Sequence, residues 1–276
     1  VSITETGSVI RAETVFERET TVLLETFKGF TDKLIDYESK VKISYHINIP
    51  EYVDIDIKNQ FGDITIDYNS GTLSADLSNG DFRANSLNRI SGFNFDFGDA
   101  EIGSVKSARI ITSFSKIRVT RSEELDLKST SSRFDLGKAG RVEIESRRDK
   151  FFIDDIDVLK GVSWFSEYSI ENLSKEADLD LKSGSIDIDK VAGEFESIVL
   201  KSAFADIKAD FDPSASYKFE IRHVNSFVVL PPGNIKTDKE TINETKKEYL
   251  ITGEAGTGSS ESRLMIDASR GNIRLN

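Results

Sequence analysis

The sequence repeats one short phrase from Val53 to its end, and this repeat restricts the possible folds more than any other feature. The phrase is an alternating apolar and polar run, a turn of small polar residues, a second alternating run and another turn. Clear copies are VDIDIKNQFGDITIDYNSG, ELDLKSTSSRFDLGKAG, DLDLKSGSIDIDKVAG and RLMIDASRGNIRL. Their period of roughly 16 to 21 residues is typical of a solenoid.

The apolar positions of successive runs are separated by an odd number of residues. Ile57 and Ile64 are seven residues apart, as are Ile266 and Ile273, and a glycine lies within each interval. Because side chains alternate in direction along a strand, an odd step indicates a corner between two runs. Coils stacked at about 4.8 Å would pair their backbones and join their apolar rows into one core. The sequence therefore predicts an all-β chain that folds as a β-solenoid, a single-stranded parallel β-helix.

Two segments depart from the repeat. Residues 1–52 contain longer strand-like runs, and we expect an N-terminal β cap there, because a solenoid must cover the end of its core and block edge pairing. Residues 53–276 would then form a β-solenoid of about ten coils. Within it, the polar and turn-rich stretch 231–262 is expected to leave the last coils before the chain returns to make the closing strand.

Three parts of the sequence carry a family resemblance: the opening phrase YHINIPEYVDIDIKNQFGDITI, the repeated copies and the terminal SRGNIRL. On these, the chain resembles a bacterial family of secreted or periplasmic β-strand-repeat proteins, named adhesins by analogy, whose β-helical domain has no established function. The resemblance implies a β-helix, which we expect to be right-handed. It also implies export to the periplasm, the outer membrane or the cell surface. It supplies no catalytic residues.

Composition excludes several classes of protein. With 36 basic and 48 acidic residues the net charge is −12, which argues against a general nucleic-acid binder. No apolar run approaches the ~20 residues of a transmembrane helix. The absence of cysteine excludes disulfides, thiolate zinc sites and thiol catalysis. The chain begins at Val1 rather than at a methionine, so we expect that a secretory or lipoprotein leader has been removed.

No catalytic or cofactor motif is present, and no cofactor is implied. His46 and His223 lie in strand-like runs without a partner at ligand spacing, so we expect both at a surface or an edge. Aspartates two residues apart, such as Asp187 and Asp189, point to one outer face. Three interpretations remain open: a solubilising face, which the regular alternation favours, a calcium site, or the paired carboxylates of a polysaccharide-cleaving enzyme.

The distribution of charge suggests a binding site. Residues 105–150 hold 12 basic and 7 acidic residues, a net charge of +5, which leaves −17 for the rest of the chain. Ile117, Phe134 and Phe151 are 17 residues apart, and we expect them at equivalent core positions. The residues that precede them would then point outward and stack as a basic ladder, which consists of Lys116, Arg133 and Lys150.

Like charges at coil spacing repel, so the basic ladder is either neutralised by nearby acidic residues or used to bind an anionic partner. The acids expected to neutralise it are Asp135, Glu145 and Asp149. In the second case, the ladder would bind an anionic partner, which could be a lipid headgroup, an acidic envelope glycan or an acidic protein surface such as that of another copy.

Aromatic residues are expected mainly in the core, with Phe93, Phe95 and Phe97 alternating on one apolar row. The coil that contains Trp164 and Tyr168 is less regular. These two side chains either stack on sugar rings at the surface or fill the core at a bulge.

Three functions follow from these observations. The first is a non-enzymatic, adhesin-like interaction module of the cell envelope, which binds a glycan, a lipid or a protein. The second is a structural envelope protein that assembles with itself. The third, least favoured, is a polysaccharide-active enzyme on a β-helix.

Overall fold

The computed structural model of the chain describes residues 2–6, 9–13, 44–233, 235–258 and 261–276. The chain divides into two compact units, Val1–Asn48 and Ile49–Asn276. In the first unit, strands β1 (Ser2–Thr6) and β2 (Val9–Glu13) form an antiparallel hairpin. The expected N-terminal cap over residues 1–52 falls mainly on residues 14–43, which lie outside the described residues.

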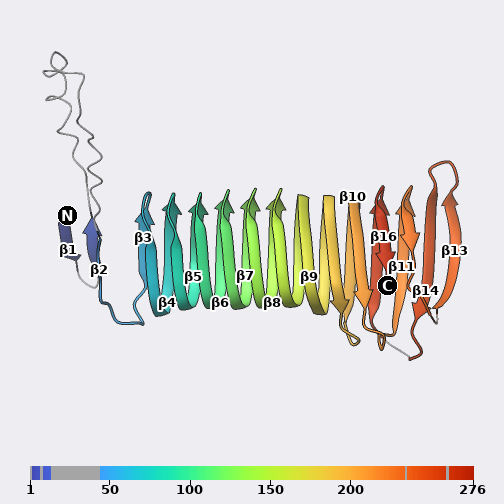
Figure 1. Cartoon of the computed structure of the whole chain (residues 1–276), viewed down its shortest axis with the longest axis horizontal. Coiled ribbons are helices and arrows are strands. Elements are labelled where there is room, and N and C mark those ends of the chain that lie inside the picture. Colours follow the sequence, from blue (N-terminus) through green and yellow to red (C-terminus); the bar gives the residue numbers. More distant parts are fainter. Residues whose placement is uncertain (1, 7–8, 14–43, 234, 259–260) are drawn as a thin grey trace, which may run out of the picture. The chain divides into compact units, whose positions relative to one another are not determined.

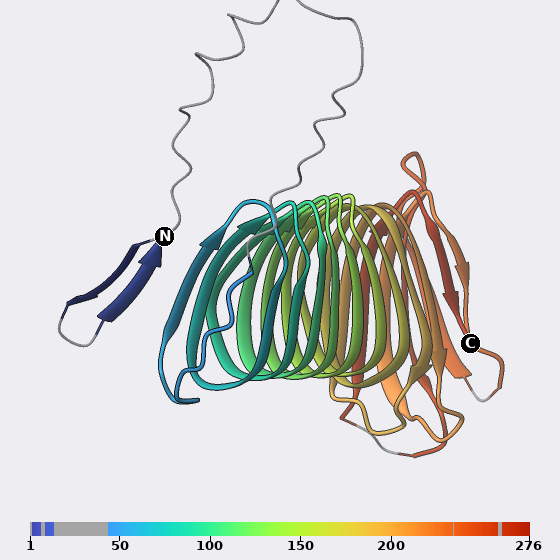
Figure 2. The ribbon, with the colours of Figure 1, turned by 60° about the vertical axis from the view of Figure 1, so that its left-hand side comes forward.

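The second unit is a β-solenoid of about 9 turns with mostly parallel strands, and the described residues contain no helix (Figure 1). The all-β solenoid prediction is confirmed. Figure 2 shows the turns stacked behind one another as closed loops of similar outline. The strands of its main body are β3 (Ile55–Asn59), β4 (Ile64–Ser78), β5 (Phe82–Asp96), β6 (Asp99–Ser113), β7 (Lys116–Thr130), β8 (Arg133–Arg147), β9 (Lys150–Val191) and β10 (Ser197–Phe211).

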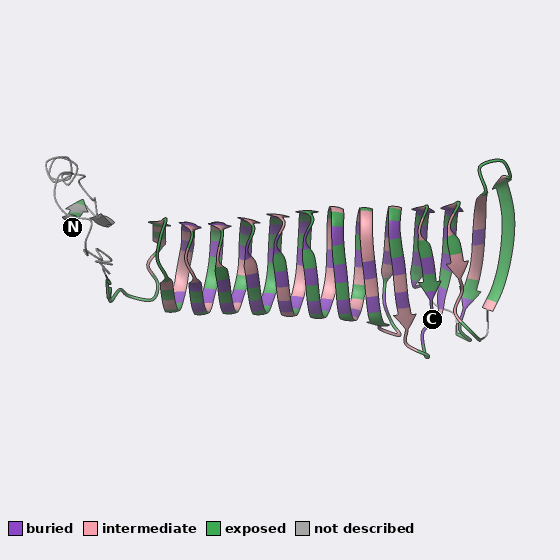
Figure 3. Ribbon diagram, turned by 45° about the horizontal axis from the view of Figure 1, so that its top comes forward, coloured by how far each residue is buried: buried purple, intermediate pink, exposed green. Residues whose placement is uncertain are grey.

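Strand β7 shows how the sequence makes one coil. Buried and exposed residues alternate along it, but two neighbouring residues are exposed at two places, next to the buried Ser122. The alternation changes phase there, which marks two bends within a continuous hydrogen-bonded strand. A third corner follows the strand, where Ser131 has a φ of +54°. Figure 3 shows the resulting bands of buried and exposed residues on each coil.

Equivalent positions on neighbouring coils stack in the core. Ile117 pairs with Phe134, and Phe134 pairs with Phe151, as the 17-residue spacing predicts. The rings of Phe134 and Phe151 are 4.9 Å apart and those of Phe151 and Tyr168 are 4.8 Å apart, both nearly parallel. The core is therefore a set of side-chain columns that run along the solenoid axis.

Strand order at the C-terminal end departs from sequence order. Strand β15 (Arg263–Ser269) lies between β10 and β11 (Tyr217–Val224) and pairs in parallel with both. Strand β16 (Asn272–Leu275) continues this coil beside β10 and β12 (Phe227–Val229). The final phrase of the sequence was expected to form the closing strand of the solenoid. Instead, it forms a coil inside the solenoid, between β10 and β11.

The stretch expected as a polar excursion contains a hairpin. Strands β13 (Ile235–Asn243) and β14 (Glu248–Ala255) are antiparallel, and β14 also pairs with β11. The solenoid has about 9 turns where about ten coils were expected. Strand β13 is mostly exposed and rich in charged residues, which protects an outer strand from pairing with other chains.

Candidate interaction surface

One face of the solenoid carries two rows of charged side chains. The first charged row consists of the residues at the start of six successive coils: Asp63, Asp81, Asp99, Lys116, Arg133 and Lys150. The second charged row lies two residues further along each coil and consists of Arg83, Glu101, Arg118 and Asp135. Strand register aligns the members of each row. We call the two rows together the charged face.

The register brings the three residues of the basic ladder together. Lys116 pairs with Arg133, and Arg133 pairs with Lys150. Their side chains are 39%, 48% and 56% exposed, so all three point outward. Each directly precedes a buried residue of the column described above. The ladder thus stands as one outward-facing basic column on β7, β8 and β9.

Acidic neighbours neutralise part of the ladder. Asp135 lies 3.6 Å from Lys116 and 2.8 Å from Arg133, and Lys150 forms an ion pair of 2.8 Å with Glu167. The guanidinium of Arg133 also lies over the exposed ring of Phe152, 3.9 Å from its centroid. Of the three acids expected to neutralise the ladder, Asp135 does so and Glu145 pairs with Lys128 instead.

The third of these acids, Asp149, points into the core and is 1% exposed. Its carboxylate accepts hydrogen bonds from the Ser129 hydroxyl (2.7 Å) and from the backbone N–H groups of Ser132 (2.7 Å) and Arg147 (3.0 Å). Burial raises the pKa of Asp149, and these hydrogen bonds oppose the increase. The position is a corner that serine or glycine occupies in neighbouring coils, which explains why alternation alone did not predict its direction.

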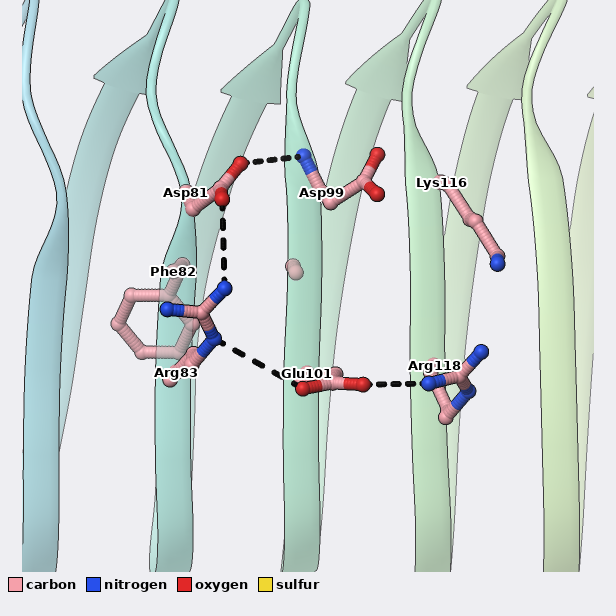
Figure 4. A pocket seen from close by; sticks show the side chains of 8 residues that line it. Asp81, Phe82, Arg83, Asp99, Glu101, Lys116 and Arg118 are labelled. Carbon is pink, nitrogen blue, oxygen red and sulfur yellow. Dashed lines mark hydrogen bonds and ion pairs between the residues drawn. The ribbon is translucent and has the colours of Figure 1, made fainter.

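The other half of the charged face is acidic. An Asp63 carboxylate oxygen accepts the backbone N–H of Asp81 at 3.0 Å, and Asp81 accepts that of Asp99 at 3.4 Å. Arg83 lies between Asp81 (3.4 Å) and Glu101 (3.8 Å), as Figure 4 shows. Where the acidic half meets the basic half, Asp81, Arg83, Asp99 and Glu101 surround a shallow polar hollow that Lys116 also lines.

The two aromatic candidates lie in different surroundings. Tyr168 is 2% exposed and stacks on Phe151 in the core, where burial raises its pKa to about 12. It therefore cannot stack on a sugar, and that interpretation was wrong for this residue. Trp164 is half-buried, and the ammonium of Lys182 lies 5.3 Å from its ring centroid. The 17-residue spacing that places the ladder also places Tyr168 in the column of Phe151.

The sequence did not predict that two phenylalanines, Phe97 and Phe114, are exposed side by side at one corner of the solenoid. Phe97 was expected in the core beside Phe93 and Phe95, but it is 55% exposed, with a φ of +59° at the corner after β5. Its ring stacks on that of Phe114, 5.3 Å away, at the same corner of the next coil. The sequence does contain a sign of this corner. Gly98 follows Phe97 and Ser115 follows Phe114, and these small residues end the alternation of apolar and polar residues.

The remaining candidate residues do not assemble into a site. Asp187 and Asp189 share the ammonium of Lys208, at 2.8 Å and 3.5 Å. Across the described ranges, no three His, Asp or Glu side chains are grouped to hold a metal ion. His223, expected at a surface or an edge, is 5% exposed on a strand paired on both sides, it packs against Tyr249, and burial lowers its pKa. His46 is exposed.

Comparisons with known proteins identify no relative: no family model, no curated protein and no solved structure matches the chain. No helix in the described residues is long and apolar enough to cross a membrane.

Proposed function

We propose that the protein is a non-enzymatic interaction module of the bacterial cell envelope that binds a negatively charged surface through its basic ladder. The observation that carries this proposal is the alignment of Lys116, Arg133 and Lys150 on three neighbouring coils. Together with Arg118, these residues bring four positive charges to the basic half of the face, and two carboxylates oppose them: Asp135 within this half and Glu167 beside Lys150.

The geometry of the ladder supports recognition of a repeated anion. Successive charges lie at the coil spacing of about 4.8 Å, on a face whose backbone is fixed by strand pairing. A rigid array loses little conformational freedom when it binds, which favours affinity. The placement in the envelope rests on the family resemblance alone.

An enzymatic function has less support. A glycosidase-like site needs two carboxyl groups facing a groove. The paired aspartates expected for that role lie on outer strand positions, and Lys208 compensates the pair Asp187 and Asp189. Self-assembly as a structural protein is the second candidate, and it is favoured by the order of opposite charges along the charged face.

The test is binding of the purified chain to heparin, as an acidic glycan, and to phosphatidylglycerol-containing vesicles at low salt. We expect salt-sensitive binding that the triple variant Lys116→Glu, Arg133→Glu, Lys150→Glu loses. The matched control is the triple variant Lys106→Glu, Arg121→Glu, Lys138→Glu. These three residues are exposed, lie outside the charged face and give the same change in net charge. Equal loss of binding in both variants would refute a role for the ladder.

A further inference from the structure

We propose that the negatively charged surface bound by the basic ladder is the acidic half of the same face in a second copy, so that two copies form a symmetric dimer. The inference rests on the proposed function, because it names the partner of the same basic residues.

The first charged row is antisymmetric in charge. Over six coils it runs through three aspartates and then three basic residues, and Glu167 on the following coil lies beyond these six. The sign changes between Asp99 on β6 and Lys116 on β7, which pair directly. A two-fold axis parallel to the strands at this point reverses the order of coils and keeps each row opposite itself. It therefore sets Asp99 against Lys116 of the second copy, Asp81 against Arg133 and Asp63 against Lys150.

The second charged row has the same antisymmetry about the same point. Its order is Arg83, Glu101, Arg118 and Asp135, and the centre again falls between β6 and β7. The same axis sets Glu101 against Arg118 of the second copy and Arg83 against Asp135. One two-fold rotation thus makes both rows complementary to themselves, although the rows differ in their order of charges. Solubility alone does not require such complementarity.

Some of the acidic half is left for a partner. In the part of the chain that the structure describes, the carboxylates of Asp63 and Asp99 form no ion pair, although Asp63 accepts one backbone hydrogen bond. The hollow between Asp81, Glu101 and Lys116 lies beside the proposed axis, on its acidic side, where side chains of a second copy would be received.

The phenylalanine corner supplies an apolar element beside the charged rows. Phe97 and Phe114 are 55% and 58% exposed and lie on either side of the same axis. The two-fold operation brings Phe97 opposite Phe114 of the second copy, so two stacked pairs would meet. Phe61, 79% exposed, would lie opposite Arg148, an arrangement suited to a cation–π contact. Exposed aromatic residues and arginine are the types enriched at the energetic centres of interfaces.

The dimensions of the face set the expected strength. Six coils at about 4.8 Å, each contributing about five residues at about 3.3 Å, give roughly 480 Å² per copy. A total near 1,000 Å² is the lower limit for a specific interface, so we expect a reversible dimer with a dissociation constant on the order of 10 µM. Such an interface is isologous and closes on itself, so it gives dimers rather than fibres.

The experiment is sedimentation of the full chain over a range of concentrations around that value, with two face variants. The acidic variant carries Lys116→Glu, Arg133→Glu and Lys150→Glu, and the basic variant carries Asp63→Lys, Asp81→Lys and Asp99→Lys. We expect the wild type to dimerise and each variant alone to be monomeric. An equimolar mixture of the two variants should form a heterodimer, although both still have a negative net charge. The control Lys106→Glu, Arg121→Glu, Lys138→Glu should dimerise like the wild type.

A circular dichroism melt of each variant verifies that it is folded. A wild type that stays monomeric at all concentrations, or a mixture that does not associate, would overturn the dimer. If that monomer still binds heparin or anionic vesicles through the ladder, the proposed function stands without the dimer. A wild type that dimerises without binding either probe supports the dimer and refutes binding of an anionic glycan or lipid.

Discussion

Replacing Phe151 by alanine should remove a large part of the stability of the solenoid. The side chain is 1% exposed, and its ring lies between those of Phe134 at 4.9 Å and Tyr168 at 4.8 Å. Core phenylalanine-to-alanine substitutions cost about 3–5 kcal/mol, and each aromatic pair contributes about 0.5–1.5 kcal/mol. Because the variant loses two pairs and the paired strands resist collapse into the cavity, we expect a loss of about 4–5 kcal/mol.

The assay is urea unfolding followed by far-ultraviolet circular dichroism, with the denaturant midpoint compared at constant slope. The matched control is Phe165→Ala, the same truncation at a corner position that is 57% exposed. Surface substitutions of this kind change stability by about 0.5 kcal/mol or less. Equal losses in the two variants would show that the stacked column does not hold the coils together, and the reasoning about the core would fail.

Three further substitutions test other parts of the structure. Asp149→Ala leaves two buried donors and one part-buried donor without an acceptor, so the free energy of unfolding should fall by about 3 kcal/mol, and an unchanged melting temperature would contradict this. Gly184→Ala places a Cβ atom 1.9 Å from the carbonyl oxygen of Ser166, at a backbone φ of +123°. Thermal unfolding should therefore show that the free energy of unfolding falls by about 3 kcal/mol or more. A decrease below about 1 kcal/mol would contradict this, because the corner would then relax easily. Burial lowers the pKa of His223, so the unfolded chain binds the proton more readily and stability should fall as the pH drops below about 6.5. Urea titrations at several pH values should show this component lost in His223→Gln and kept in His46→Gln, and identical pH profiles would contradict it.

The register of the solenoid could be predicted because it depends on spacing alone. Ile117, Phe134 and Phe151 are apolar, 17 residues apart and surrounded by alternating residues, so they had to share a core column. The outward direction of the residues before them followed from the alternation of a strand. Tyr168 follows Phe151 by the same 17 residues, so the spacing could also have predicted that this tyrosine is buried.

Corners were harder to predict than strands. At the corner after β5, Phe97 adopts a positive φ, which bulky residues seldom do, so continued alternation wrongly placed it in the core. At the equivalent corner region before β9, Asp149 occupies a position that is usually small and turns inward. In both places the backbone changes direction within a few residues. Whether one residue is apolar or charged does not predict such a change of direction.

The place of β15 could not be read from the sequence for a different reason. Its alternating apolar residues suit any edge of the solenoid, and its phrase resembles those of other coils. Whether it closes the stack or enters it depends on pairing between segments far apart in the chain, and here it pairs with both β10 and β11.

The insertion of β15 bears on how the protein folds. An ordinary solenoid can grow coil by coil, because each new turn pairs with the one just made. Here the coil next to β10 comes from 66 residues further along the chain, and β11 and its hairpin join the body through β15. Closing that loop costs entropy before any pairing compensates for it, so the C-terminal coils should form in a later and slower step than the body. Strand β11 pairs with the body only through β15, although the ring of Tyr217 also packs on Phe195 and Phe211, so β15 joins the C-terminal end into one cooperative unit.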